Sequence, residues 1–136
     1  MLYFAYGSNL NIKQMKQRCP DSVGIARAVL EGWKLVERTY ADIEEAENEC
    51  VNGAIYEISE DDLAGLDYYE GYPEYYTRQE VMVKDDAGRY HKAWVYTMTE
   101  ECGKRRDTGK YSERYRKICS DGAESWGIPN AFAFSV

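Results

Sequence analysis

Residues that usually build metal sites, disulfides or histidine-based catalytic triads are scarce in this sequence. The 136 residues include one histidine, His91, and four widely spaced cysteines without a C-x-x-C pair, Cys19, Cys50, Cys102 and Cys119. This supply argues against a structural zinc site and leaves His91 as the one candidate base for a triad. We expect no bound metal, His91 at the surface, and cysteines that act as small packing residues.

Long apolar runs are also absent. No segment approaches the roughly 20 apolar residues that are needed to span a bilayer. The N-terminal residues lack the basic segment, the longer apolar stretch and the small-residue cleavage site of an export signal. We therefore expect no membrane association and a cytoplasmic protein with reduced thiols.

An excess of positive charge is missing as well. The chain has 17 basic and 24 acidic residues and a formal net charge of -7, which disfavours binding to nucleic acid or to anionic lipid. One local cluster of basic residues is interrupted by acidic ones, so we expect it to be solvated surface. Its members are Lys104, Arg105, Arg106, Lys110, Arg114, Arg116 and Lys117.

What remains is the composition of an ordinary globular domain. Hydrophobic residues make up 44% and charged residues 30%, and the length suits one hydrophobic core rather than two. No repeat, low-complexity segment or linker divides the chain. We therefore expect residues 1–136 to form a single domain.

Strand-like segments predominate along the chain. Apolar runs bounded by turn residues predict six strands, with a break at Glu31–Gly32 between the second and third, and a hairpin formed by the last two. The acidic, aperiodic segment Asp42–Glu49 is expected to be an exposed loop, and the C-terminal segment 131–136 could add a last strand. The six strands are Leu2–Tyr6, Ser22–Leu30, Trp33–Thr39, Val51–Ile58, Tyr76–Lys84 and Tyr90–Met98.

Three helices are predicted from capping residues and apolar spacing. The first is capped by Asn11 and ends near Arg18, and the second opens with a capping box at Ser59 and ends at Gly71. The third covers Ser112–Trp126. Because strands and helices do not alternate steadily, the predicted fold class is α+β rather than a doubly wound sheet.

The segment YGSNL, Tyr6–Leu10, lies between the first strand and the first helix. Successive backbone N–H groups at such a junction can converge on a carboxylate or an oxyanion. Gly, Ser and Asn also favour plain turns for conformational reasons alone. The residues by themselves leave both interpretations open.

A second candidate is Glu70 in the segment LDYYEGYPEYYTR, Leu66–Arg78. Glu70 falls at the end of the second predicted helix among several tyrosines, with Gly71 and Pro73 directly after it. A carboxyl group in an aromatic pocket loses solvation, which raises its pKa and makes it a useful base near neutral pH. A solvated glutamate beside ordinary aromatic packing would explain the same pattern.

The two segments together resemble the γ-glutamylcyclotransferase-like family, whose members carry an N-terminal YGSNL loop and a downstream E-G-x-P-x-x-Y segment. Arg18–Leu35 looks like the second strand region of that family, and Tyr111–Pro129 looks like its C-terminal helix. The resemblance thus covers nearly the whole chain. It implies a small mixed β-barrel with peripheral helices and a pocket at the barrel end formed by Tyr6–Leu10.

The resemblance also implies roles for particular residues. Glu70 would be the catalyst, and Tyr115 would supply a pocket hydroxyl, although Lys110, Tyr111 and Ser112 stand where the family often has Pro-Ser. Tyr76 could line the same pocket, and aromatic packing in the core would explain it equally well. The substrate-binding residues carried over from the loop are Tyr6, Gly7, Ser8, Asn9 and Leu10.

The reaction implied by the resemblance is intramolecular aminolysis of a γ-glutamyl amino acid or γ-glutamyl amine, giving 5-oxoproline and a free amine without a metal or organic cofactor. The acidic segment Glu44–Glu49 suggests one refinement, a cationic leaving group, although acidic segments are usually only solvated. Two alternatives are a catalytically idle module that binds a small carboxylate in the same pocket and a protein-binding surface rich in tyrosine.

Overall fold

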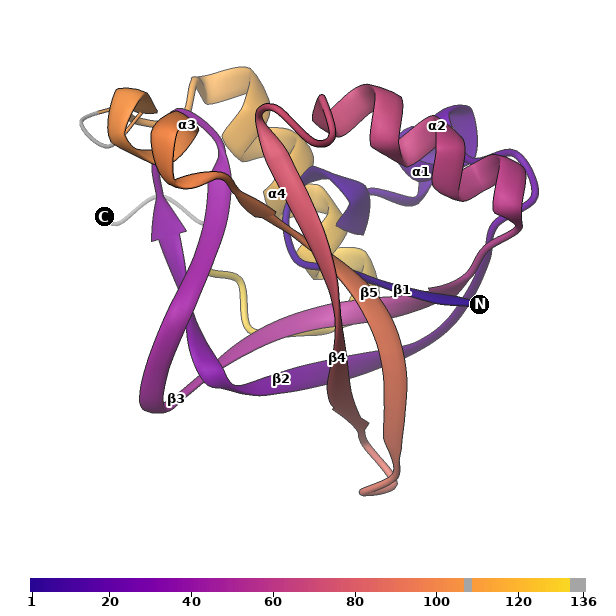
Figure 1. Ribbon diagram of the computed structural model, residues 1–136. Helices are drawn as coiled ribbons and strands as arrows, with labels where there is room; N and C mark the ends of the chain where they lie inside the picture. Colours follow the sequence, from indigo (N-terminus) through magenta and orange to yellow (C-terminus); the bar gives the residue numbers. More distant parts are fainter. Residues whose placement is uncertain (107–108, 133–136) are drawn as a thin grey trace.

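The fold of the chain is a closed five-stranded β-barrel with helices gathered over one end (Figure 1). The computed structural model describes residues 1–106 and 109–132. The strands follow the order β1-β3-β2-β4-β5 around the barrel, and the short parallel contact of β1 with β5 closes it. They are β1 Leu2–Ala5, β2 Val23–Glu37, β3 Ala41–Glu57, β4 Tyr76–Asp85 and β5 Tyr90–Met98.

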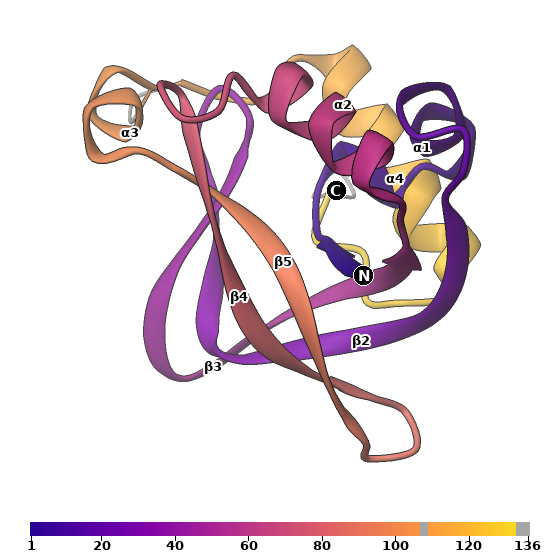
Figure 2. The ribbon, with the colours of Figure 1, turned by 45° about the vertical axis from the view of Figure 1, so that its right-hand side comes forward.

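The helices connect and cover these strands. The 3-10 helix η1 (Ser8–Leu10) and α1 (Ile12–Arg18) follow β1, whereas α2 (Glu60–Glu70) joins β3 to β4. The two last helices, α3 (Glu100–Arg106) and α4 (Glu113–Trp126), follow β5. Figures 1 and 2 show α1, α2 and α3 at one end of the barrel, with the tip of the β4–β5 hairpin pointing away from the opposite end. The predicted mixed barrel with peripheral helices is confirmed.

The β2–β3 hairpin differs from its prediction at two places. The strand β2 continues through Glu31–Gly32, where a register shift and a positive φ of 82° at Gly32 bend it without ending it. The expected loop at Asp42–Glu49 belongs to β3, and its residues Asp42–Glu45 pair with β2. Its outward acidic side chains face water and one of them, Glu44, pairs with Lys34 at 3.3 Å, so the segment needs no apolar alternation on that side.

The capping residues Asn11 and Ser59 gave the correct starts for two helices, and apolar spacing gave the third, which Ser112 caps. The side chain of Asn11 accepts a hydrogen bond from the backbone N–H of Gln14 at 3.2 Å, and Ser59 forms a capping box with Asp62. The hydroxyl of Ser112 accepts from the N–H of Tyr115 at 3.1 Å. These bonds satisfy backbone donors that the first helical turn leaves free.

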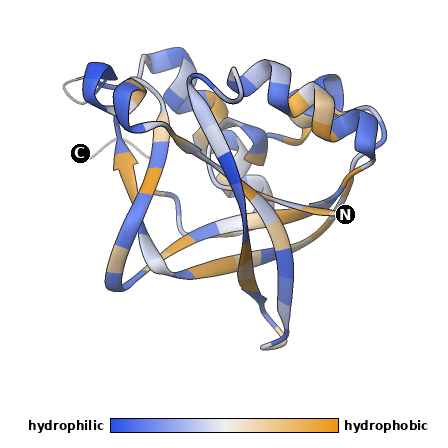
Figure 3. Ribbon diagram, in the orientation of Figure 1, coloured by the Kyte–Doolittle hydropathy of each residue, from blue (hydrophilic) through white to orange (hydrophobic). Residues whose placement is uncertain are grey.

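The helix α3 was not predicted. It has seven residues, and Figure 3 shows it as largely hydrophilic, so it carries no apolar stripe from which a helix could be inferred. Its start is marked only by the Thr99 hydroxyl, which accepts from the N–H of Cys102 at 3.3 Å. At the C-terminus, Ala131 and Phe132 form a turn, and the rest of the predicted last strand lies outside the described residues.

The barrel interior is closely packed where β1 pairs with β3. The Phe4 side chain is fully buried there, and a Cβ atom at Gly53 would lie 2.5 Å from its Cζ atom and collide with the carbonyl oxygen of Ala5. A side chain at position 53 would therefore force β1 and β3 apart. No helix of the described residues is long and apolar enough to cross a membrane.

We expect Gly53→Ala to destabilise the protein by about 1–3 kcal/mol, because overpacking between these two paired strands displaces the backbone. Gly103→Ala is the matched control, since its Cβ would meet only the Arg38 side chain at 3.8 Å and alanine favours the helix. Urea denaturation measures both free energies of unfolding. Equal stability of Gly53→Ala and the native protein would show that β1 can yield at no cost.

Candidate active site

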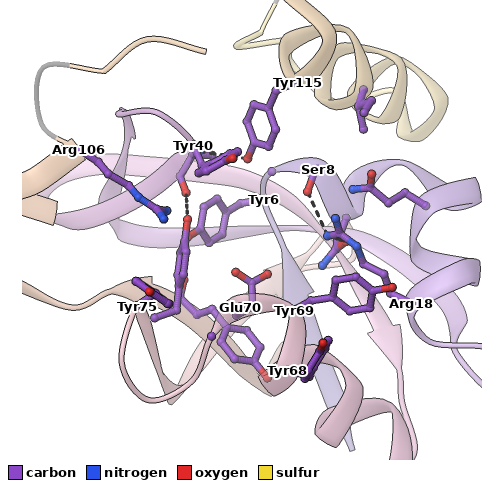
Figure 4. Close-up of a pocket in the computed structure, with 18 of the residues that line it drawn as sticks. Tyr6, Ser8, Arg18, Tyr40, Tyr68, Tyr69, Glu70, Tyr75, Arg106 and Tyr115 are labelled. Carbon is purple, nitrogen blue, oxygen red and sulfur yellow. Dashed lines mark hydrogen bonds between the residues drawn. The ribbon is translucent and has the colours of Figure 1, made fainter. Parts of the chain in front are cut away.

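A cavity of about 630 Å³ opens at the helix-covered end of the barrel (Figure 4). Its wall is built from the loop after β1, the end of α2, the start of β3 and the facing side of α4. Segments that are far apart in the sequence thus meet around one space. The two segments that the sequence singled out, Tyr6–Leu10 and the surroundings of Glu70, both contribute to it.

Glu70 is the one acidic residue among the described residues that line the cavity. It is the last residue of α2, which ends at Gly71 in the left-handed conformation with φ of 66°. Burial raises the pKa of Glu70 to about 7, although the positive charges of Arg18 and Arg106 act in the opposite direction. Its carboxylate makes no hydrogen bond to another described residue, so it is free to exchange a proton with a ligand.

Asp67 fixes the end of α2 against the barrel. Arg78 on β4 donates two hydrogen bonds to its carboxylate, at 2.8 and 3.2 Å, and Tyr96 on β5 donates a third at 2.6 Å. This carboxylate lies one helical turn before Glu70 and is fully engaged, whereas Glu70 is not. The contrast separates a structural carboxylate from one that is available for chemistry.

The loop after β1 forms one wall of the cavity. The first hydrogen bond of η1 runs from the N–H of Leu10 to the carbonyl of Gly7 at 3.1 Å. The N–H groups of Gly7, Ser8 and Asn9 precede this bond and have no acceptor within the 3-10 helix. These three residues and Tyr6 line the cavity. Leu10 does not, because its side chain is fully buried in the core.

Asn9 holds this loop in place. The side chain is buried and donates through Nδ2 to the Tyr3 hydroxyl at 3.0 Å, while its Oδ1 accepts from Nη1 of Arg18 at 2.8 Å. Its carbonyl accepts from the Tyr56 hydroxyl at 2.9 Å. Arg18 also approaches Oγ of Ser8 at 3.4 Å. Asn9 therefore contributes its backbone to the cavity and its side chain to the scaffold.

Tyr76 and Tyr115 hold the start of β3 from two sides. The Tyr76 hydroxyl donates to the Ala41 carbonyl at 3.0 Å, and the Tyr115 hydroxyl accepts from the Ala41 N–H at 3.1 Å. Both tyrosines line the cavity, and burial raises the pKa of both hydroxyls, so they stay neutral at physiological pH.

Gly7 is needed beside Tyr115. A Cβ atom at position 7 would lie 3.1 Å from the Tyr115 hydroxyl and 3.2 Å from Cβ of Ala41. The absence of a side chain thus lets the loop, α4 and β3 approach one another. The sequence-predicted residues are brought together here, with Leu10 as the exception.

Three arginines of the cavity lining, Arg18, Arg106 and Arg114, were missed by sequence reasoning. Arg18 stacks on the ring of Tyr69 at 4.7 Å, and Arg106 lies over the rings of Tyr40 at 5.0 Å and Tyr75 at 5.7 Å. Figure 4 shows the two guanidinium groups on opposite sides of Glu70. Arg106 belongs to the basic cluster that was expected to be solvated, and no local signal distinguishes it from its neighbours.

The residues considered for metal or thiol chemistry lie elsewhere. The described residues contain no group of three or more His, Cys, Asp or Glu side chains that could hold a metal ion. His91 is half-buried in the β4–β5 hairpin, where its Nε2 lies 2.7 Å from Asp85. Three cysteines, Cys19, Cys102 and Cys119, are buried free thiols, as expected of packing residues, whereas Cys50 is an exposed free thiol.

Comparison with known proteins agrees with this arrangement. The sequence model of the family described as "Gamma-glutamyl cyclotransferase, AIG2-like" matches residues 3–117. The bovine protein named gamma-glutamylcyclotransferase is 30% identical across 94% of this chain and 72% of its own length. A 70-residue stretch is 37% identical to a Methanocaldococcus jannaschii protein, covering 49% of this chain and 58% of that protein.

The fold is shared as well. A solved structure of a protein named gamma-glutamyl cyclotransferase superimposes with a TM-score of 0.81 at 27% sequence identity, covering 95% of this chain and 81% of the other. The family model, the relatives and the barrel therefore agree with one another. The chain belongs to the gamma-glutamyl cyclotransferase, AIG2-like family of enzymes.

Proposed function

We propose that the protein converts a small γ-glutamyl compound into 5-oxoproline and a free amine, with Glu70 as the acid/base catalyst. The observation that carries this proposal is Glu70 itself. Its carboxylate has no hydrogen-bond partner among the described residues, burial raises its pKa to about 7, and it lies in a tyrosine-lined cavity that the loop after β1 also lines. Family membership supports the same reaction class.

The proposed reaction is an internal aminolysis. The α-amine of the γ-glutamyl group attacks its own γ-carbonyl carbon, so one C–N bond forms as the ring closes and the original amide C–N bond breaks. The proton leaves the attacking nitrogen for Glu70 and passes from Glu70 to the leaving nitrogen. Because nucleophile and electrophile share one molecule, the main task of the protein is to hold the ring-closing conformation.

The pKa of Glu70 determines the free energy of this proton transfer. An α-amine with a pKa of ~8 would transfer its proton to an ordinary glutamate with a pKa of ~4.3 at a cost of about 5 kcal/mol. With the pKa of Glu70 raised to about 7, the cost falls to about 1.4 kcal/mol. The protonated Glu70 can then donate this proton to the leaving amine.

The opposite wall supplies the complementary groups. We assign the N–H groups of Gly7, Ser8 and Asn9, which line the cavity, to binding the substrate α-carboxylate or the oxyanion that develops on the γ-carbonyl. Arg18 adds a positive charge at the same wall. Tyr115 adds a hydroxyl group from α4. None of these groups needs to form a covalent bond to the substrate.

The alternative function is a catalytically idle module that binds a small carboxylate in this cavity. The loop, Arg18 and Tyr115 would serve it equally well. Glu70 favours the enzyme, because a desolvated, unpaired carboxylate would weaken the binding of an anion. A binding module gains nothing from keeping it.

We expect Glu70→Gln to abolish turnover while substrate binding is retained, with a loss in kcat of at least about 100-fold because the proton acceptor is gone. Mass spectrometry of 5-oxoproline released from a panel of γ-glutamyl amino acids and amines measures this. Glu74→Gln is the matched control, because Glu74 is exposed and does not line the cavity. Release of 5-oxoproline by Glu70→Gln at the native rate would refute the catalytic role.

The second expectation concerns pH. Glu70 must be deprotonated to accept a proton, so kcat/KM should rise with pH and level off near the Glu70 pKa of about 7. Below that value the rate should fall about tenfold per pH unit. A pH series from 5 to 8 tests this, and a profile that is flat between 5 and 7 would contradict the assignment.

The third expectation is that Glu70 costs stability. Its folded-state pKa of about 7 lies above the ordinary value of 4.5, so the native state binds the proton more tightly and loses stability as pH rises from 4.5 to 7. Glu70→Gln carries no such charge and should have the higher Tm at pH 8. The difference should vanish below pH 4.5, and thermal unfolding at both pH values measures it. A lower Tm for the variant at pH 8 would be the contrary result.

A further inference from the structure

Resting on the proposed function, we propose that Arg106 recognises a carboxylate on the leaving amine. The preferred substrates are then γ-glutamyl amino acids or peptides that bear this carboxylate, rather than γ-glutamyl amines. Arg106 is thereby a specificity-determining residue on the side of Glu70 opposite to Arg18 (Figure 4). Three observations carry this assignment.

The first is that Arg106 lacks an anionic partner among the described residues. Its neighbours on α3 are paired within the helix, Lys104 with Glu100 at 3.3 Å and Arg105 with Glu101 at 4.0 Å. Arg106 instead is half-buried and lines the cavity, and its guanidinium group lies over the rings of Tyr40 and Tyr75. A partly desolvated guanidinium without a counter-ion is a ready site for a carboxylate, which it can bind through two parallel hydrogen bonds.

The second observation is the order of charges across the cavity. Arg18 stands at the loop side, Glu70 in the middle and Arg106 at the far side (Figure 4). A γ-glutamyl amino acid carries an α-carboxylate, an α-ammonium and, beyond the amide, a second carboxylate. With the α-carboxylate at the loop and the ammonium at Glu70, the second carboxylate falls on the side of Arg106. A γ-glutamyl amine would leave Arg106 unpaired.

The third observation is the net charge of the cavity. Among the described residues, its lining contains three arginines, Arg18, Arg106 and Arg114, and one acidic residue, Glu70. The site is therefore positive inside a chain whose formal net charge is -7. A positive cavity attracts a substrate with two carboxylates and one ammonium and disfavours one whose leaving group is a cation.

The acidic segment Glu44–Glu49 does not counter this argument. None of its residues lines the cavity, and Glu44 already pairs with Lys34 on the neighbouring strand. The sequence-based reason to expect a cationic leaving group therefore has no counterpart at the site.

The test compares two substrates of almost equal shape, γ-glutamyl-alanine and γ-glutamyl-alaninamide, which differ in the charge of the leaving group. We expect the native protein to favour the acid in kcat/KM by roughly 10- to 100-fold, as for a charge-assisted hydrogen bond. Arg106→Gln should bring the ratio of the two kcat/KM values close to one. Taking the ratio cancels any effect of the lost charge on Glu70.

Arg105→Gln is the control, because it removes the same charge from the same helix at a position that does not line the cavity, and its ratio should stay native. A merely structural role of Arg106 would lower both rates and leave the ratio unchanged, which would overturn the inference. If Arg106→Gln does not fold, Arg106→Lys keeps the charge without the planar fork and should give an intermediate ratio.

The native protein alone separates the two proposals. Equal release of 5-oxoproline from the acid and the carboxamide would refute the role of Arg106 and leave the proposed reaction standing. No release from either compound by folded protein would refute the proposed reaction, and this inference with it.

Discussion

The site depends on one carboxyl group, that of Glu70, which burial largely removes from water and which has no hydrogen-bond or ion-pair partner among the described residues, although the charges of Arg18 and Arg106 act on it from either side. Glu70 sits at the C-terminal end of α2, where the carbonyl groups of the last helical turn add a negative potential to the cost of lost solvation. A fold can hold such a group only if other interactions over-determine its position. The cavity, the arginines on either side and the tyrosines of the lining together form the environment of that carboxyl group.

The compensation lies close by. The capping box at Ser59 secures the start of α2, and Asp67, with its two arginine bonds and one tyrosine bond, ties the end of the helix to β4 and β5. On the opposite wall, Asn9 uses both ends of its side-chain amide to fix the loop after β1. The hydrogen bonds of Asp67 and Asn9 thus fix two walls of the cavity, whereas Glu70 between them has no hydrogen bond to a described residue.

Features encoded by nearby residues could be predicted from the sequence, and features created by distant ones could not. Caps such as Asn11 and Ser59, the helix end at Gly71 and the β4–β5 hairpin each depend on a few neighbouring residues. The continuous β3 strand depends on pairing with β2, which overrides its acidic composition. Arg18 and Arg106 reach the site only through the packing of α1 and α3, so nothing beside them in the sequence identifies them.

The bonds at Ala41 have a consequence for how this site can vary. Tyr76 and Tyr115 contact its carbonyl and its N–H, and neither bond involves a side-chain atom of residue 41. Evolution can therefore exchange residue 41 for other small residues without loosening the wall, limited only by the space that Gly7 leaves. A comparison of invariant side chains would therefore not identify the start of β3, although its backbone shapes the cavity.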